Sequence, residues 1–148
     1  MIEKLFDEVY EKFKLNFYKN IFKSFENREA TLTATETFCV EVINALGRPT
    51  ISELTEFLEI SQPNTAYKVA SLVKKGYVNK VQSQEDKREF YLELTDRFRK
   101  YQDIKNEYIK VVIDRMKNGL PEEDLKKFEE ILYKISNEYM PEVTSSEE

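Results

Sequence analysis

The stretch that most constrains the fold is a short helix with a marked start and a marked end, between Ser61 and Gly76. Ser61 is a residue type that accepts a hydrogen bond from a free backbone N–H at a helix start, and Pro63 is tolerated in the first turn. Gly76 readily adopts the left-handed conformation that ends a helix. The residues in between are amphipathic at 100° per residue. The sequence therefore predicts a helix with one packed face and one exposed face.

The two faces of this predicted helix differ in chemistry. The packed face has small and apolar residues: Thr65, Ala66, Val69, Leu72 and Val73. The other face has polar, aromatic and basic residues: Asn64, Tyr67, Ser71 and Lys74, with Lys68 and Lys75 at its edge. Such a face is available to contact another molecule.

Two capped helices are predicted directly before this one. Thr33 and Glu36 form a capping-box pattern, in which each side chain bonds the other residue's backbone N–H, and this helix ends at Gly47 and Pro49. Thr50 and Glu53 repeat the pattern and open a third, short helix. Since only residues 59–61 separate it from the next helix, the two must cross steeply, as in a helix-turn-helix.

A β-hairpin is predicted after Gly76, because the periodicity changes to alternation. Residues 77–82 and 89–94 are typical of strands, and the polar segment 83–88 joins them. A charged hairpin directly after such a helix is typical of a wing, whose tip can reach a minor groove of DNA. Lys87 and Arg88 are the residues expected to reach it.

Long helices are predicted on both sides of this central part. Residues 2–25, 96–118 and 121–139 have apolar residues at helical spacing, and residues 141–148 are expected to form a frayed tail. The stripe of the first helix is aromatic on more than one side. This width predicts burial against two neighbours or against another subunit.

Composition narrows the classes of function. There is no histidine and a single cysteine, Cys39, so neither a conventional zinc site nor an intrachain disulfide is expected. Without a histidine, a nucleophile elbow or a glycine-rich phosphate loop, no reaction class can be assembled, and we predict neither an enzyme nor a cofactor. No apolar run is long enough for a membrane span, and the N-terminus does not resemble a signal peptide. We therefore expect a soluble cytoplasmic protein.

Charge is unevenly distributed along the chain. The formal net charge is −5, yet residues 61–91 carry 6 basic and 3 acidic residues, whereas the segments on both sides are acidic. The net charge of short segments varies by a few units by chance, so the charge is informative only together with the predicted helix and hairpin. The basic segment coincides with both.

The order of elements and several short motifs resemble the MarR family of bacterial transcription regulators. The matching motifs lie at residues 32–40 (LTATETFCV), 53–54 and 60–61, 72–78 (LVKKGYV), 86–88 (DKR), 94–95 and 120–125 (LPEEDL). Tyr67 departs from the family, many of whose members carry an arginine on the recognition helix. The resemblance covers nearly the whole chain.

The resemblance implies a mainly α, winged helix-turn-helix protein with a small β-hairpin wing and long terminal dimerisation helices. It predicts a single MarR-like unit over residues 1–148, with dimerisation helices at 1–30 and 96–140 and a DNA-binding lobe at 33–95. It also implies a homodimer that binds double-stranded DNA at an inverted repeat, as a repressor. The recognition helix is then 61–75 and the wing 83–88.

Each predicted DNA contact follows from its residue type. Asn64 suits adenine, and lysines neutralise phosphates. Asp86 is expected to orient Arg88 in the wing by a charge-assisted hydrogen bond. Thr65 is equally compatible with a core position, and a lysine on an exposed helix is often only solvated. The full predicted set is Gln62, Asn64, Thr65, Tyr67, Lys68, Ser71, Lys74, Lys87 and Arg88.

Two further expectations stay open at the level of sequence. An apolar or aromatic effector pocket and a plain aromatic core both explain the aromatic residues Phe13, Phe17, Phe38, Tyr101 and Tyr108. Cys39 is expected to be structural, because it lies on the inward face of its helix. The alternative function is a winged-helix protein-interaction module that has lost its affinity for DNA, which Tyr67 and the acidic total would explain.

Overall fold

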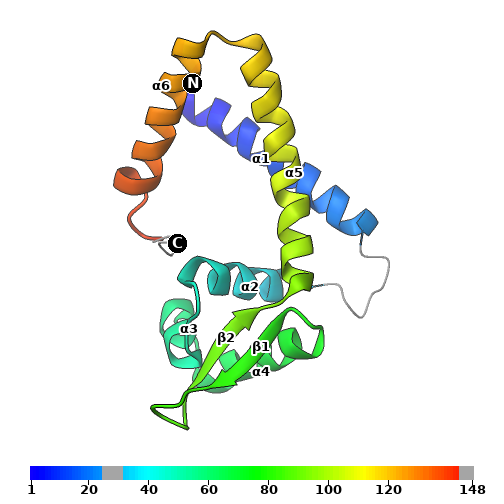
Figure 1. The fold of residues 1–148 in the computed structure, drawn as a ribbon, viewed down its shortest axis with the longest axis vertical. Coiled ribbons are helices and arrows are strands. Elements are labelled where there is room, and N and C mark those ends of the chain that lie inside the picture. Colours follow the sequence, from blue (N-terminus) through cyan, green and yellow to red (C-terminus); the bar gives the residue numbers. More distant parts are fainter. Residues whose placement is uncertain (25–31, 144–148) are drawn as a thin grey trace. The chain divides into compact units, whose positions relative to one another are not determined.

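The computed structural model describes residues 1–24 and 32–143. Its elements are α1 (Ile2–Ser24), α2 (Ala34–Leu46), α3 (Ile51–Leu58), α4 (Gln62–Lys74), β1 (Val78–Gln82), β2 (Phe90–Leu94), α5 (Asp96–Gly119), α6 (Glu122–Lys134) and a π-helical turn, η2 (Ile135–Tyr139) (Figure 1). This order confirms the predicted mainly α fold with one antiparallel hairpin. Phe25 and residues 144–148, for which a helix end and a tail were predicted, lie outside the described residues.

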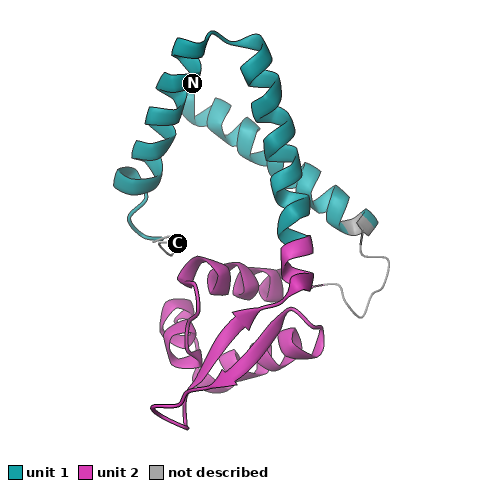
Figure 2. Cartoon of the chain, in the orientation of Figure 1, with its two compact units in different colours: residues 1–26, 101–143 teal, residues 27–100, 144–148 magenta. Residues whose placement is uncertain are grey.

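The chain divides into two compact units (Figure 2). Unit 1 is Met1–Glu26 with Tyr101–Val143, and unit 2 is Asn27–Lys100 with Thr144–Glu148. Unit 1 contains α1, most of α5, α6 and η2, whereas unit 2 contains α2, α3, α4 and the hairpin. The helix α5 begins in unit 2 and continues into unit 1.

The helix starts of unit 2 are set by local hydrogen bonds. Thr33 Oγ1 accepts from the N–H of Glu36 at 3.2 Å, and the Glu36 carboxylate accepts from the N–H of Thr33 at 3.0 Å, which confirms the capping box of α2. At α3, Thr50 Oγ1 accepts from the N–H of Glu53 at 3.1 Å. The turn between α3 and α4 passes through Glu59, whose φ of 54° places it in the left-handed region.

The core of unit 2 lies between its three helices and the hairpin. The strands pair antiparallel from Val78 opposite Leu94 to Gln82 opposite Phe90. A bridge between Thr50 and Tyr91 joins the start of α3 to β2. The buried apolar side chains come from every element of unit 2: Cys39, Val40, Val42, Ile43, Leu54, Val69, Leu72, Tyr77, Val78, Leu92 and Phe98.

In unit 1, aromatic rings join α1 to α5. Phe13 meets Tyr108 edge to face with ring centroids 5.4 Å apart, and Phe17 meets Tyr101 in the same way at 5.1 Å. The last predicted helix, 121–139, is correct in extent but changes from α to π geometry at Ile135. Many large apolar side chains of α1 and α6 are exposed, among them Phe6, Val9, Ile131 and Leu132.

Candidate nucleic-acid interface

The solvent-facing side of α4 presents most of the polar and aromatic residues that the sequence assigned to it, with the exception of Ser71. Gln62, Asn64 and Lys74 are exposed, and Tyr67 is 78% exposed although it is a large aromatic side chain. Lys68 is half-buried. Ala66 and Val73 were predicted to pack, but both are exposed, so the packed face of α4 is narrower than the apolar pattern indicated.

The two ends of α4 are closed by the predicted signals. Ser61 Oγ accepts from the N–H of Asn64 at 3.4 Å. At the other end Gly76 has a φ of 83°, and the N–H groups of Gly76 and Tyr77 donate to the carbonyls of Val73 and Leu72. This is a Schellman motif, which satisfies carbonyls that the helix end would leave free.

Two of the predicted DNA contacts, Thr65 and Ser71, form hydrogen bonds inside unit 2. Thr65 is fully buried, and its hydroxyl donates to the Ser61 carbonyl at 3.3 Å. Thr65 is therefore a core residue, and its prediction as a groove contact is corrected because the side chain does not reach the surface. Ser71 is half-buried and donates to Glu36 Oε2 at 2.6 Å, so its hydroxyl is engaged inside unit 2.

Glu36 forms a buried polar contact with the end of α4. Its carboxylate accepts from Lys75 Nζ at 2.7 Å, from Ser71 Oγ at 2.6 Å and from the N–H of Thr33 at 3.0 Å. Burial by itself raises the pKa of this carboxyl, but the hydrogen bonds from Lys75, Ser71 and Thr33 outweigh burial and lower the pKa to about 2. Glu36 is therefore ionised at neutral pH and paired with a cation.

Side chains at the start of α5 bind the backbone carbonyls at the C-terminal end of α4. The Arg97 guanidinium donates to the Lys75 carbonyl at 2.6 Å, and Thr95 Oγ1 donates to the Gly76 carbonyl at 2.5 Å. Arg97 also lies over the ring of Tyr77, 6.0 Å from its centroid. Sequence analysis missed this role of Arg97 and the second role of Glu36, because no local pattern links residues 22 to 39 positions apart.

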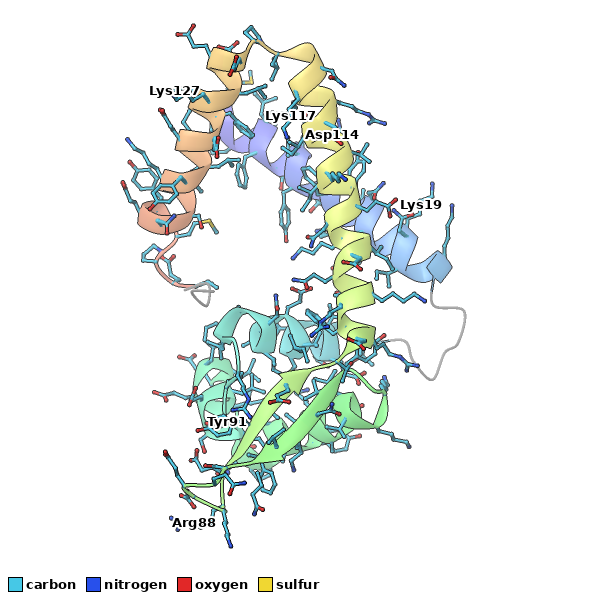
Figure 3. The ribbon with its side chains drawn as sticks, viewed as in Figure 1. Lys19, Arg88, Tyr91, Asp114, Lys117 and Lys127 are labelled. Atoms are coloured by element: carbon cyan, nitrogen blue, oxygen red, sulfur yellow. The ribbon has the colours of Figure 1, made fainter. Side chains whose placement is uncertain are left out.

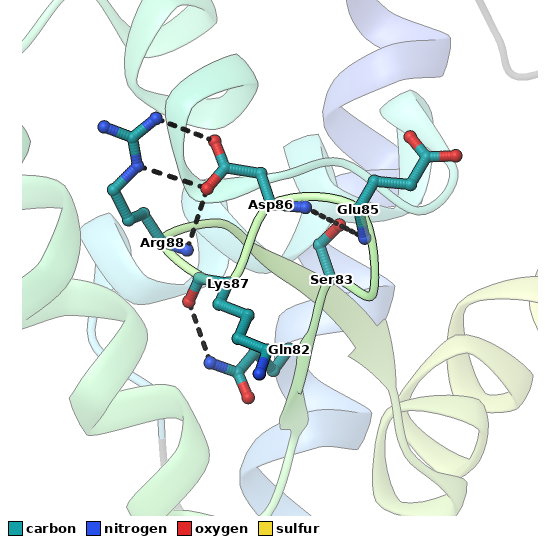
Figure 4. A network of polar contacts seen from close by, with 6 residues as sticks. All are labelled: Gln82, Ser83, Glu85, Asp86, Lys87 and Arg88. Carbon is teal, nitrogen blue, oxygen red and sulfur yellow. Dashed lines mark hydrogen bonds and ion pairs between the residues drawn. The ribbon is translucent and has the colours of Figure 1, made fainter.

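The wing is a tight loop built by side chain to backbone hydrogen bonds (Figure 4). Ser83 Oγ accepts from the N–H groups of Glu85 and Asp86, both at 3.3 Å. Gln82 Nε2 donates to the Lys87 carbonyl at 2.8 Å. These bonds order the loop on both sides of its most exposed residues.

Arg88 is held at the wing by Asp86. Asp86 Oδ1 accepts from Arg88 N–H at 3.0 Å and from Nε at 3.2 Å, and Oδ2 accepts from Nη2 at 3.3 Å (Figure 4). The Arg88 side chain hydrogen bonds, followed by its backbone N–H, lower the pKa of Asp86. The Arg88 side chain is 91% exposed and lies at the tip of the hairpin (Figure 3). The neighbouring Lys87 is exposed as well.

The five residues of the predicted effector pocket lie in both units. Phe13, Phe17, Tyr101 and Tyr108 belong to unit 1, where they pack ring to ring in two pairs. Phe38 belongs to unit 2 and is 57% exposed. An effector therefore stays a prediction.

Neither a metal centre nor a membrane helix is found in the described part of the chain. Across residues 1–24 and 32–143, no three histidine, cysteine or acidic side chains are grouped so that they could hold a metal ion. Among the same residues, no helix combines the length and the apolar character that a membrane crossing requires.

Comparisons with known proteins agree with this geometry. Residues 32–90 match the model of the MarR family. A search of curated protein sequences found no match. Solved structures share the fold at low sequence identity, and each of the three described next covers at least 90% of both chains.

The first of these structures is a MarR family protein from Bacillus stearothermophilus, with a TM-score of 0.66 and 16% identity over 93% of this chain and 92% of that one. The second is the transcriptional regulator Tm0710 from Thermotoga maritima, with a TM-score of 0.65 and 19% identity over 90% of each chain. The third is FabT from Streptococcus pneumoniae in complex with DNA, with a TM-score of 0.59 and 18% identity over 91% of this chain and 94% of that one.

The matched residues 32–90 include α2, α3, α4 and the wing, which are the elements that form the candidate interface. The likeness to the solved structures extends beyond them into the helices of unit 1. Residues 32–90 therefore match the MarR family model, and the chain shares its fold with a solved MarR family protein over most of its length.

Proposed function

We propose that this protein is a transcription regulator that binds an inverted-repeat operator as a homodimer, through α4 and the wing of each subunit. The observation that carries the proposal is the exposed polar side of α4 beside an ordered wing that presents Arg88. An α-helix fits the major groove of DNA, and an arginine at a wing tip suits the narrower minor groove. The solved complex of FabT with DNA, which shares the fold, is consistent with this mode of binding.

The contacts divide into those that read bases and those that neutralise phosphates. Asn64 has the amide that pairs with adenine N6 and N7, and Gln62 and Tyr67 are also exposed on α4. Lys68, Lys74 and Lys87 supply positive charge for phosphates. Because residues 61–91 carry a net positive charge within an acidic chain, binding is directed to this surface.

The exposed apolar side chains of unit 1 support the proposed dimer. Phe6, Val9, Ile131 and Leu132 are exposed in the single chain, and a second copy with two-fold symmetry would bury such residues. A two-fold dimer places two α4 helices on one side of DNA with half-sites about 10 base pairs apart, which requires an inverted repeat.

Fluorescence anisotropy with genomic fragments, followed by footprinting of the tightest one, tests this proposal. We expect binding that weakens steeply with salt, and an affinity about tenfold lower for Arg88→Ala, because a groove arginine is lost. Arg99→Ala is the matched control, since Arg99 is an exposed arginine of unit 2 paired with Asp96 and lies outside the proposed interface.

The same titration distinguishes DNA binding from the alternative function. If no fragment is bound at any salt concentration, the DNA-binding proposal fails, and a winged-helix protein-interaction module becomes the better explanation. The exposed ring of Tyr67 would then be the centre of a protein contact. Repression is tested separately, by placing the footprinted fragment before a reporter gene, where we expect lower expression with the protein than without it.

A further inference from the structure

The last turn of α4 is held by contacts from two directions within unit 2. From α2, the Glu36 carboxylate accepts hydrogen bonds from the side chains of Ser71 and Lys75. From the start of α5, Arg97 and Thr95 donate to the backbone carbonyls of Lys75 and Gly76. Side chains and backbone of the same turn are therefore anchored at once.

The two adjacent lysines at this turn differ in their surroundings. Lys74 is exposed. Lys75 has a side chain that is only 20% exposed, and its ammonium lies 2.7 Å from a carboxylate oxygen of Glu36, whose side chain is 7% exposed. An ammonium that is paired inside a protein is not available to replace the counterions of a phosphate, whereas an exposed one is.

Breaking this pair from one side has a specific physical consequence. Replacing Lys75 by an apolar residue leaves a buried carboxylate without its cation, which is strongly unfavourable, so the helix end must move to let water reach Glu36. Replacing both partners by neutral residues removes the cause of that movement. The pair is therefore suited to hold the direction of α4.

We propose that Glu36 is a positioning residue, which fixes the C-terminal turn of α4 through Ser71 and Lys75, and that Lys75 orients the recognition helix instead of neutralising a phosphate. The inference rests on the proposed DNA-binding function, because it concerns how α4 enters the groove. It assigns different roles to two neighbouring lysines that are indistinguishable by residue type.

The salt dependence of operator binding distinguishes the two lysines. For Lys74→Met, we expect the slope of log affinity against log salt to fall by about one for each subunit, because a phosphate contact is lost. For Lys75→Met, we expect an unchanged slope together with a loss of about tenfold in the ratio of operator to non-specific affinity, since a tilted helix loses base contacts first. An equal loss of slope in both variants would overturn the proposal.

A double substitution tests whether Glu36 acts through Lys75. If the two residues act as one pair, Glu36→Gln with Lys75→Met should lower the ratio of operator to non-specific affinity no further than Lys75→Met alone. A merely destabilising change would lower both affinities by the same factor. If the double variant is as impaired as the two single variants combined, Glu36 does not act through Lys75.

Amide hydrogen exchange of the DNA-free protein tests whether Lys75 holds the end of α4. The amides of Lys75, Gly76 and Tyr77 donate to the carbonyls of Ser71, Val73 and Leu72. In Lys75→Met these three amides should exchange about tenfold faster than in the wild type, while Lys74→Met should leave them unchanged. If the wild type binds no DNA, the proposed function fails. Unchanged amide exchange in Lys75→Met would separately refute the role of Lys75 in holding the end of α4.

Discussion

Units 1 and 2 bury their apolar side chains to very different degrees. Among the described residues, all the buried apolar side chains except Tyr101 belong to unit 2. The large exposed ones, apart from Phe38, Tyr67 and Val73, belong to unit 1. Both units contain amphipathic helices, so helical character alone does not explain the difference.

This contrast indicates that unit 2 has a closed core and that unit 1 does not. In unit 2 three helices and a hairpin enclose one set of side chains, whereas α1, α5 and α6 leave many large apolar side chains exposed. Exposed apolar faces of this extent are typical of surfaces that another molecule covers. The three exceptions in unit 2 are single residues, and single exposed apolar side chains are normal on a protein surface.

The largest effect is expected in the core of unit 2. Leu54 is fully buried on α3, so Leu54→Ala should lower the free energy of unfolding by about 2–5 kcal/mol, because apolar contacts are lost and a cavity forms. Urea unfolding measures this change. Ser52→Ala, at an exposed position of the same helix, should change it by less than about 0.5 kcal/mol. A loss below about 1 kcal/mol for Leu54→Ala would contradict a closed core.

The next effect concerns Glu36, whose carboxylate is buried in that core. The pKa of Glu36 is lowered from 4.5 to about 2 in the folded protein, so the unfolded state binds more protons as the solution becomes acid. Stability from this group is present above about pH 4.5 and is lost as the pH falls toward 2, by about 3 kcal/mol in total.

Glu36→Gln should remove this acid-dependent part of the unfolding free energy, which urea titrations at a series of pH values would show. Glu53→Gln, at an exposed glutamate of α3, is the control and should keep it. An identical pH profile for the wild type and Glu36→Gln would contradict the assigned ion pair.

A smaller effect is expected from unit 1, and it should depend on a second copy. Ile131 is 45% exposed on α6, so Ile131→Asp should convert the proposed dimer to a monomer without unfolding unit 2. Operator affinity should then fall about 100-fold, because the two recognition helices no longer bind as one molecule. Light scattering gives the molar mass, and anisotropy gives the affinity.

Asn118→Asp adds the same charge to unit 1 at an exposed position and should leave the dimer intact. If Ile131→Asp stays dimeric, the exposed apolar side of α6 is not the subunit contact. The contrast between the two units would then need a different partner.

The smallest effect is expected at Cys39. This cysteine is 1% exposed in unit 2, and burial raises the pKa of its thiol. Cys39→Ala should therefore leave operator affinity within about twofold of wild type, and an aromatic disulfide reagent should react about 100-fold faster after unfolding in urea than before. Rapid modification of the folded protein that abolishes DNA binding would contradict a closed unit 2.

Features that depend on a few neighbouring residues could be predicted from the sequence. The capping box of Thr33 and Glu36, the left-handed Gly76 and the contact of Asp86 with Arg88 each join residues no more than three positions apart or concern one residue alone. The strands were also predicted to within one residue of their ends, since alternation is a local pattern.

Predictions that depended on the width of a packed face were less accurate. Ala66 and Val73 are exposed although helical periodicity placed them inside, whereas Thr65 is buried, as its place on the packed face predicted. Periodicity gives the direction of a side chain from its own helix axis, but it does not give the position of the neighbouring elements that cover it.

The sequence alone determined the order of elements, the ends of α4 and the chemistry of its exposed side, because caps and periodicity act within one or two turns. Only the tertiary structure decided which of the adjacent Lys74 and Lys75 is paired, since Glu36 lies 39 residues before Lys75 and reaches it through the packing of α2 against α4. The pairing of charges depends on distance in space, and identical residue types have different roles once the fold has set that distance.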